Sequence, residues 1–315
     1  MTATVSVLDA SHPLVSVVIT TKNEERNIER CLQSILAQTY QPIEIIVVDN
    51  FSTDQTREIA QRYTSKVYEK GPERSAQRNF GMIDAASGAY VIFVDADMIL
   101  SPALIENCVA RMARGDCVAL HIREIVLGRN FWSQVRRFER TFYDGTPIDG
   151  ARFFLRSAFI EVGGFDAELF TEGSGEDWDI DKLIKRVGSI ALLSERSSED
   201  QQWEKALSTY VQSRGVAPSL RDPHIYHNES EFELGKYLRK KSYYAKGFDG
   251  YIRKWGKTDP DIQRQFGIGY RYFGVFIEQG KWRKLLAHPG LAAGMYFLRF
   301  LVGLTFIMRK RSVAL

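Results

Sequence analysis

The sequence predicts an α/β fold with a doubly wound, mainly parallel sheet, and three observations support this. Uncharged, β-branched runs recur at 15–20, 45–48 and 90–94, as expected of strands that are buried on both faces. The segments between them carry apolar residues at helical spacing. The connections are short. Alternating strands and helices of this kind place helices on both faces of the sheet and ligands beyond the strands' carboxyl ends.

The first strand, VSVVIT at 15–20, is followed by a helix that opens near Glu25. The second strand, IEIIVVDN at 43–50, is followed by a helix that runs to about Tyr63, for which Ser52 to Asp54 supply cap residues. A short strand at 66–69 and a helix over 73–86 come next.

The fourth strand begins the stretch YVIFVDADMIL, residues 90–100, and is expected to be central. Asp95 and Asp97 arrive where it ends, and Pro102 soon opens another helix. Two carboxylates one residue apart at a strand end can both reach one divalent cation. Taken alone, the pair is equally compatible with a solvated turn or a helix cap.

Polar residues also follow the other strands, with Lys22, Asn23 and Glu24 after the first and Asp49 and Asn50 after the second. Loops at one edge of the sheet therefore converge on a single crevice. The chain has no GxGxxG after the first strand and no GxxxxGK[ST], so dinucleotide-binding and P-loop functions lose their main support.

Five ordered motifs resemble those of glycosyltransferase family 2, whose members have the nucleotide-sugar-binding fold called GT-A. The resemblance covers about residues 14–190. The motifs are VSVVITTKNEE, IIVVDNFSTDQT, RSAQRNFGMIDAASGAYVIFVDAD, GGFD and GEDWD.

The resemblance implies a site for a nucleotide-sugar donor at the strand ends and on the helix that follows residue 73. Asn50 stands where the family often has a second Asp, so the resemblance does not define which nucleobase the donor carries. Asp49 and Glu24 can alternatively be capping residues, and the arginines a solvated pair. The donor-contacting residues would be Thr20, Asn23, Glu24, Asp49, Arg74, Arg78, Asn79, Asp95 and Ala96.

The resemblance also makes Asp97 the direct ligand of Mn²⁺ or Mg²⁺, hard cations that prefer oxygen ligands. Many family members carry a His that follows the catalytic base in the chain and approaches the metal. His227 matches that position best. His224 competes for the role, and both can be ordinary loop residues.

In GEDWD, residues 175–179, the resemblance makes Asp177 the base that deprotonates the acceptor hydroxyl, with Glu176 as runner-up. Crowded carboxylates raise one another's pKa, which suits a base. Capping of the next helix is the alternative. Asp166 and Trp178 are possible acceptor contacts, although Trp178 is equally plausible as a core aromatic. One base without a second nucleophile predicts a single displacement with inversion.

The C-terminal part is basic. Residues 235–315 have a net charge of +13, whereas residues 1–234 have a net charge of −10. This distribution suggests an anionic membrane surface as partner. No nucleic-acid-binding motif accompanies these charges. The apolar stretch 289–308 contains Arg299, so we expect a helix that lies in the membrane interface rather than one that is buried or spans the bilayer.

The predicted organisation is a tail at 1–13, a GT-A catalytic domain at 14–230 and a basic helical region at 231–315. No signal peptide opens the chain, and Cys31, Cys108 and Cys117 read as reduced core residues, so we expect a protein at the cytoplasmic face of the membrane.

The expected function is a metal-dependent, inverting glycosyltransferase that acts on a glycan or lipid-linked acceptor in polysaccharide synthesis. A sugar-nucleotide nucleotidyltransferase would need a glycine-rich basic loop where KNEE stands. An inactive nucleotide-sugar-binding scaffold is the non-enzymatic alternative, which the presence of both DAD and GEDWD argues against.

Overall fold

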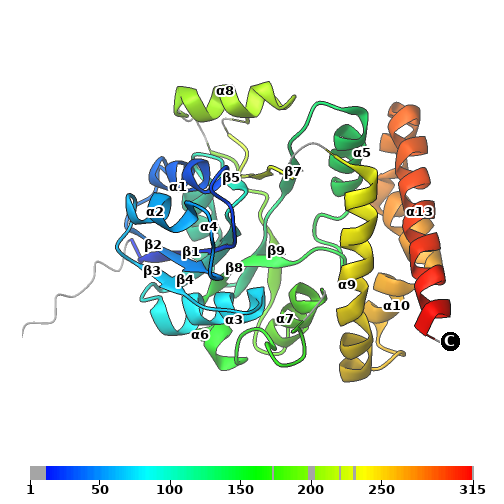
Figure 1. Ribbon diagram of the computed structural model, residues 1–315, viewed down its shortest axis with the longest axis horizontal. Coiled ribbons are helices and arrows are strands. Elements are labelled where there is room, and N and C mark those ends of the chain that lie inside the picture. The colour runs from blue at the N-terminus through cyan, green and yellow to red at the C-terminus, as the bar shows by residue number, and fades with distance from the viewer. Residues whose placement is uncertain (1–11, 172–173, 198–202, 220, 230–231, 314–315) are drawn as a thin grey trace, which may run out of the picture.

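The computed structural model describes residues 12–171, 174–197, 203–219, 221–229 and 232–313. A seven-stranded sheet lies between helices, with strand order β3-β2-β1-β4-β8-β6-β9, and only β8 runs antiparallel to its neighbours (Figure 1). This is the doubly wound, mainly parallel sheet that the sequence predicts. The strands are β1 (Val15–Thr21), β2 (Ile43–Asp49), β3 (Val67–Glu69), β4 (Tyr90–Asp95), β6 (Ala119–His121), β8 (Ala151–Leu155) and β9 (Ile190–Leu192).

Each face of this sheet packs into its own apolar core, because successive side chains of β1, β2 and β4 point to opposite sides. Cys31, Cys108 and Cys117 are free and buried, as expected. The helices of this part are α1 (Ile28–Leu36), α2 (Thr56–Gln61), α3 (Arg74–Asn79), α4 (Leu104–Met112), α6 (Arg156–Glu161), α7 (Glu176–Ile184) and α8 (Lys205–Ser213).

The helix expected over 73–86 is divided. It begins as α3 and continues as a π-helical segment, η1 (Phe80–Ala85). The helix expected after Pro102 begins at Leu104. A short strand, β5 (Met98–Leu100), lies between this helix and the DAD stretch.

A second, three-stranded sheet has the order β5-β10-β7, with β10 (Ile225–His227) between β5 and β7 (Glu124–Val126). In this register His227 pairs with Met98, the residue after Asp97. The small sheet thus carries a late part of the chain to the end of β4.

The C-terminal helices stand beside the sheet as a separate layer (Figure 1). They pack on α5 (Phe131–Arg140), so one apolar cluster joins Val135 and Phe142 to Phe276 and Leu298. These elements are α9 (Leu234–Trp255), α10 (Pro260–Phe266), η2 (Tyr270–Gly274), α11 (Val275–Ile277), η3 (Glu278–Gly280), α12 (Trp282–Ala287) and α13 (Pro289–Val313).

The prediction that the helix over 289–308 lies in a membrane interface needs correction at Arg299. This side chain is buried against α5, where its Nη1 donates to Glu139 Oε1 at 2.7 Å and to the Tyr143 hydroxyl. Within the described ranges, none of the helices has the length and apolar character that crossing a bilayer requires.

Candidate active site

The ends of β1 and β4 meet at one edge of the sheet. Thr20 pairs with Asp95 in the register, and its hydroxyl donates to Asp95 Oδ1 at 3.3 Å. Asp49 lies opposite Thr21 on the next strand. Three of the donor-site residues predicted from the sequence therefore gather here because parallel strands end together.

Arg78 is the charged residue at the centre of this edge. Its side chain is 2% exposed, and its guanidinium lies 4.0 Å from the centroid of the Phe93 ring. Nη2 lies 3.3 Å from Asp95 Oδ1, and Nη1 lies 2.9 Å from Asp177 Oδ1. One buried arginine thus links the DAD stretch to the GEDWD stretch.

The carboxyl of Asp95 is held as an anion. Burial alone would raise its pKa, but the positive charges of Arg78, Arg152 and Arg74 together bring the pKa well below the ordinary value. Asp95 therefore supplies a fixed negative charge that orients Arg78.

The two acidic candidates of GEDWD differ in environment. Glu176 is buried and pairs with Arg74 at 2.6 Å, and burial still raises its pKa. Asp177 has a side chain that is 40% exposed. A Cβ on Gly150 would lie 2.9 Å from the Asp177 Cβ, so the glycine permits this close approach. Of the two, Asp177 is the one that an acceptor hydroxyl can reach.

Asp97 and His227 lie in contact. His227 Nε2 is 3.1 Å from Asp97 Oδ2, and His227 Nδ1 is 2.7 Å from Glu124 Oε1. Burial lowers the pKa of His227, but these two carboxylates raise it well above its ordinary value. His224 instead lies against the backbone carbonyl of Asp222, at 2.9 Å.

These residues fit a divalent cation. Asp97 Oδ1 is buried and has no hydrogen-bond partner in the described chain, so a hard oxygen donor is left over. The Glu124–His227 contact is the carboxylate–histidine pair that commonly orients a metal-bound imidazole. Within the described ranges no group of three or more His, Cys, Asp or Glu side chains is arranged to hold a metal ion.

On the nucleotide side, several predicted residues stabilise loops. Asp49 accepts from the backbone N–H and hydroxyl of Ser52, and Asn23 Oδ1 accepts from the backbone N–H of Thr53 at 2.9 Å. Asn50 donates to the Pro72 carbonyl. The Glu24 carboxylate accepts from Asn27 at 2.7 Å, and burial raises its pKa. Ala96 is buried between the two aspartates of DAD.

Asn79 and the GGFD loop form a reciprocal pair. The Asn79 side chain donates to the Phe165 carbonyl at 2.7 Å and accepts from the Phe165 N–H at 2.8 Å. Gly164 has φ +70°, and a Cβ there would lie 2.6 Å from Asn79 Oδ1. Asp166 caps the Leu169 N–H and pairs with Lys254 of α9 at 2.9 Å. Asn79, predicted to contact the donor, and Asp166, predicted to contact the acceptor, therefore both have partners within the protein.

The Trp178 side chain is partly buried. Its indole N–H donates to the Ile148 carbonyl at 3.0 Å, and its ring stacks on Phe248 of α9 with the centroids 5.4 Å apart. It is thus a partly buried aromatic between α7 and α9. It also lines a pocket with Asp177, Gly150 and Arg152.

Three charged residues near the crevice were not found from the sequence: Glu124, Arg140 and Arg152. Glu124 Oε2 lies 2.7 Å from Arg140 and 3.2 Å from Arg152. Glu124 and Arg152 are single charges in short strands and Arg140 is the last residue of a helix, so each is a weak sequence signal without a motif.

Comparison with known proteins finds a match to one protein family. Residues 16–167 match the family model described as Glycosyl transferase family 2. The chain is 38% identical over 101 residues to the uncharacterized glycosyltransferase EpsJ of Bacillus subtilis (strain 168), which covers 30% of this chain and 29% of that protein. It is 38% identical over 94 residues to the glycosyltransferase AglE of Haloferax volcanii, covering 27% and 31% respectively. The matches thus span less than a third of these relatives' length.

Among solved structures, the mannosyltransferase PcManGT from Pyrobaculum calidifontis, solved in complex with GDP-Man and Mn²⁺, superposes with a TM-score of 0.56. The likeness covers 96% of this chain and 81% of that chain, at 19% sequence identity. It confirms the predicted GT-A fold.

Proposed function

We propose that the chain, whose residues 16–167 match the model of glycosyltransferase family 2, transfers a sugar from a nucleotide donor to an acceptor hydroxyl with inversion. The observation that carries the proposal is the link of Asp177 to Asp95 through Arg78, which joins a partly exposed carboxylate of GEDWD to the DAD stretch. The PcManGT complex, which holds a nucleotide sugar and Mn²⁺, supports the same assignment.

In this reaction Asp177 takes the proton of the acceptor hydroxyl while the oxygen attacks the anomeric carbon of the donor. The bond from that carbon to the diphosphate breaks, and the nucleoside diphosphate leaves with the electron pair. Arg74 and Arg78 offer positive charge to the leaving diphosphate. Asp97 and His227 would hold Mn²⁺ or Mg²⁺, which adds positive charge at the same place.

The nucleoside would lie over the ends of β1 and β2, where Thr20, Glu24 and Asp49 are gathered. The loops there are held by the contacts of Asn23 and Asp49, so these two side chains would act by shaping the pocket.

The test is calorimetric binding of UDP, GDP, ADP and CDP, with and without Mn²⁺. We expect one nucleotide to bind the wild type in a Mn²⁺-dependent manner and to be lost in Asp97→Ala. Asp84→Ala, at an exposed position on η1, is the matched control and should bind as the wild type does. Absence of nucleotide binding to folded protein would overturn the proposal.

The C-terminal helices would bring the enzyme to an anionic membrane, where a lipid-linked or cell-surface glycan acceptor is found. Of thirteen exposed large apolar side chains in the described residues, eight lie between 268 and 304, so they concentrate on this layer. They are Ile268, Phe273, Ile277, Trp282, Leu286, Phe297, Phe300 and Leu304.

A further inference from the structure

Helix α7 is fastened to the chain segment that leads into β8. This segment, residues 148–151, is the strap. The Trp178 indole N–H donates to the first carbonyl of the strap at 3.0 Å, and Asp181 Oδ1 accepts from the Ala151 N–H at 2.9 Å. Two side chains of α7 therefore hold the two ends of the strap.

Asp177 lies against the middle of the strap. It precedes Asp181 by one helical turn, so the two carboxylates project from the same face of α7. A Cβ on Gly150 would lie 2.9 Å from the Asp177 Cβ, which makes this the closest approach of strap and helix at the base. Gly150 and Asp177 also line one pocket of about 60 Å³ together with Arg152. The position of the strap thus affects how Asp177 meets a molecule in that pocket.

A histidine of β6, His121, acts on both sides of this glycine. Its Nε2 lies 2.7 Å from Asp181 Oδ2, and the other oxygen of that carboxylate holds the Ala151 N–H. Its Nδ1 lies 3.7 Å from Asp149 Oδ2. One imidazole therefore connects to the residue before Gly150 directly and to the residue after it through a single carboxylate.

This cluster is enclosed by protein, because His121, Asp149 and Asp181 are all buried. Arg140 of α5 lies 3.9 Å from Asp149, but its closer partner is Glu124, at 2.7 Å. The residues of β8 and β9 that lie opposite His121 in the sheet are uncharged. Two buried carboxylates need positive charge nearby, and the imidazolium of His121 is the group that contacts both.

The pKa of His121 reflects these neighbours. Burial lowers it, but the carboxylates of Asp181 and Asp149 together raise it above its ordinary value, and the charge of Lys185 on α7 opposes them only in part. The charged form of His121 is therefore favoured up to a higher pH than in an ordinary histidine.

We propose that His121 is a positioning residue of the active site, which ties the strap to α7 and so fixes Asp177 relative to the acceptor. The inference rests on the proposed transferase function, because that function makes Asp177 the base. His121 touches neither donor nor acceptor in this role. Its effect on the reaction passes through Asp181 and the strap.

The first experiment is hydrogen–deuterium exchange of the whole protein, measured by mass spectrometry. The amide in His121→Gln can still donate to Asp181 but carries no charge. We expect peptides from the strap and from the first turn of α7 to exchange faster in this variant, while peptides from β1 and β2 exchange as in the wild type. His288→Gln, at an exposed histidine of the C-terminal layer, is the control and should change neither region. Unchanged exchange of the strap in His121→Gln would overturn the inference.

The second experiment separates positioning from a purely structural role. The probes are UDP-glucose and GDP-mannose without an acceptor, and the readout is release of the nucleoside diphosphate. Water then replaces the acceptor: its oxygen bonds to the anomeric carbon, Asp177 takes its proton, and the diphosphate leaves with the electron pair. We expect His121→Gln to lower kcat by up to about 100-fold, as a small misplacement of a reacting group can, with unchanged affinity for the nucleoside diphosphate. A lowered thermal midpoint with unchanged kcat would assign His121 a structural role only.

The pH dependence of the wild type is a third readout, and it does not depend on whether a variant folds. As the pH rises through the raised pKa of His121, the imidazole loses its charge and the strap should loosen. Exchange of the strap, corrected for the intrinsic effect of pH, should therefore increase and kcat should fall, whereas His121→Gln should lack this transition. Wild-type exchange that stays constant across the titration of His121 would contradict the proposed role.

Failure of this inference can be told apart from failure of the transferase proposal. If no nucleoside diphosphate binds to the folded wild type, the transferase function is refuted. If one binds and His121→Gln exchanges and reacts as the wild type does, only the positioning role is refuted. If the wild type releases no nucleoside diphosphate without an acceptor, exchange of the strap and its pH dependence give the answer.

Discussion

Asp177 and Glu176 are adjacent in α7, yet only one of them faces outward. The side chain of Glu176 is 3% exposed and its charge is taken by Arg74, whereas that of Asp177 is 40% exposed. A base needs access to the acceptor, so the difference in exposure supports the proposal of Asp177 over Glu176.

Asp177→Asn should lower kcat by about 10²- to 10⁴-fold, because the amide cannot accept the acceptor's proton. Binding of the nucleoside diphosphate should change little. Steady-state kinetics together with calorimetry test this, with Glu176→Gln as the comparison. A large loss in Glu176→Gln with activity retained in Asp177→Asn would move the role of base to Glu176.

Glu124→Gln tests the support of His227. The neutral amide holds the imidazole less firmly, so the Mn²⁺ concentration needed for nucleotide binding should rise by about 10- to 100-fold. A Mn²⁺ titration at fixed nucleotide measures it, with the exposed Glu58→Gln as control. An unchanged titration would show that His227 needs no such partner.

The sequence correctly predicted that Asp95 and Asp97 lie at the end of a buried strand and that Asp177 lies in the first turn of a helix, because apolar runs mark these element ends; their roles stay predictions. It was not sufficient for Glu124, which reaches His227 across 103 residues of chain. Pairings of that kind depend on the register of the three-stranded sheet, which no local pattern encodes.

At the scale of elements, α13 is held to α5 by a buried ion pair. Arg299→Met should destabilise the fold by about 3–5 kcal/mol, since Glu139 would lose one of its two cations in a buried site. Denaturant unfolding measures the loss, and Arg283→Met, at an exposed position of α12, should cost far less. Equal stability of the two variants would mean that the ion pair contributes nothing.

The ion pair between Glu139 and Arg299 predicts that the stability of the fold depends on pH. Burial raises the pKa of Glu139, but Arg136 and Arg299 bring it down to about 2 from an ordinary 4.5. A carboxyl with a depressed folded-state pKa stabilises the fold above about pH 4.5, and this contribution is lost as the pH falls toward 2. The stability difference between wild type and Arg299→Met should therefore shrink over that interval in acid titrations followed by circular dichroism. A constant difference would argue against Glu139 as the source.

The elements of the catalytic half follow from sequence periodicity, since β1, β2 and β4 are buried runs with clear ends. For α13 periodicity was misleading. The central Arg299 reads as a cost in an apolar helix, and its partner Glu139 lies 160 residues earlier.

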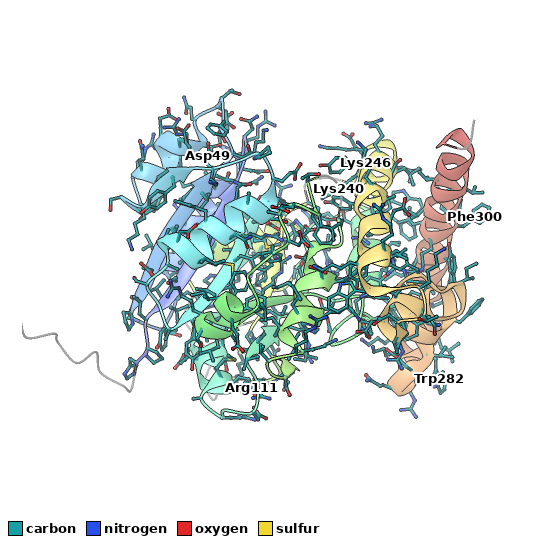
Figure 2. All side chains as sticks on the ribbon, turned by 90° about the horizontal axis from the view of Figure 1, so that it is seen from below. Asp49, Arg111, Lys240, Lys246, Trp282 and Phe300 are labelled. Atoms are coloured by element: carbon teal, nitrogen blue, oxygen red, sulfur yellow. The ribbon has the colours of Figure 1, made fainter. Side chains whose placement is uncertain are left out.

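At the scale of the whole molecule, two exposed apolar side chains of the C-terminal helices, Trp282 and Phe300, lie on the side of the molecule away from Asp49 (Figure 2). The exposed fractions of Phe300 and Trp282 are 57% and 44%. Together with the +13 balance of residues 235–315, this arrangement suits an interface with anionic lipid.

The double change Phe300→Ser with Leu304→Ser should reduce binding to vesicles of phosphatidylcholine and phosphatidylglycerol by removing apolar area that would insert. Co-sedimentation measures it. Leu36→Ser, at a 55% exposed leucine on α1 in the catalytic half, is the control. If the control lowers binding as much, the C-terminal helices are not the contact surface.

The contact between α5 and α13 also determines when this part of the protein can fold during biosynthesis. Glu139 and Arg299 are 160 residues apart, so at translation rates of about 5–20 residues per second the ribosome needs roughly 8 to 30 seconds to supply the second after the first. During that time the aromatic side of α5 has no cover from α13. A nascent chain of this protein should therefore be a chaperone client until its last helix emerges.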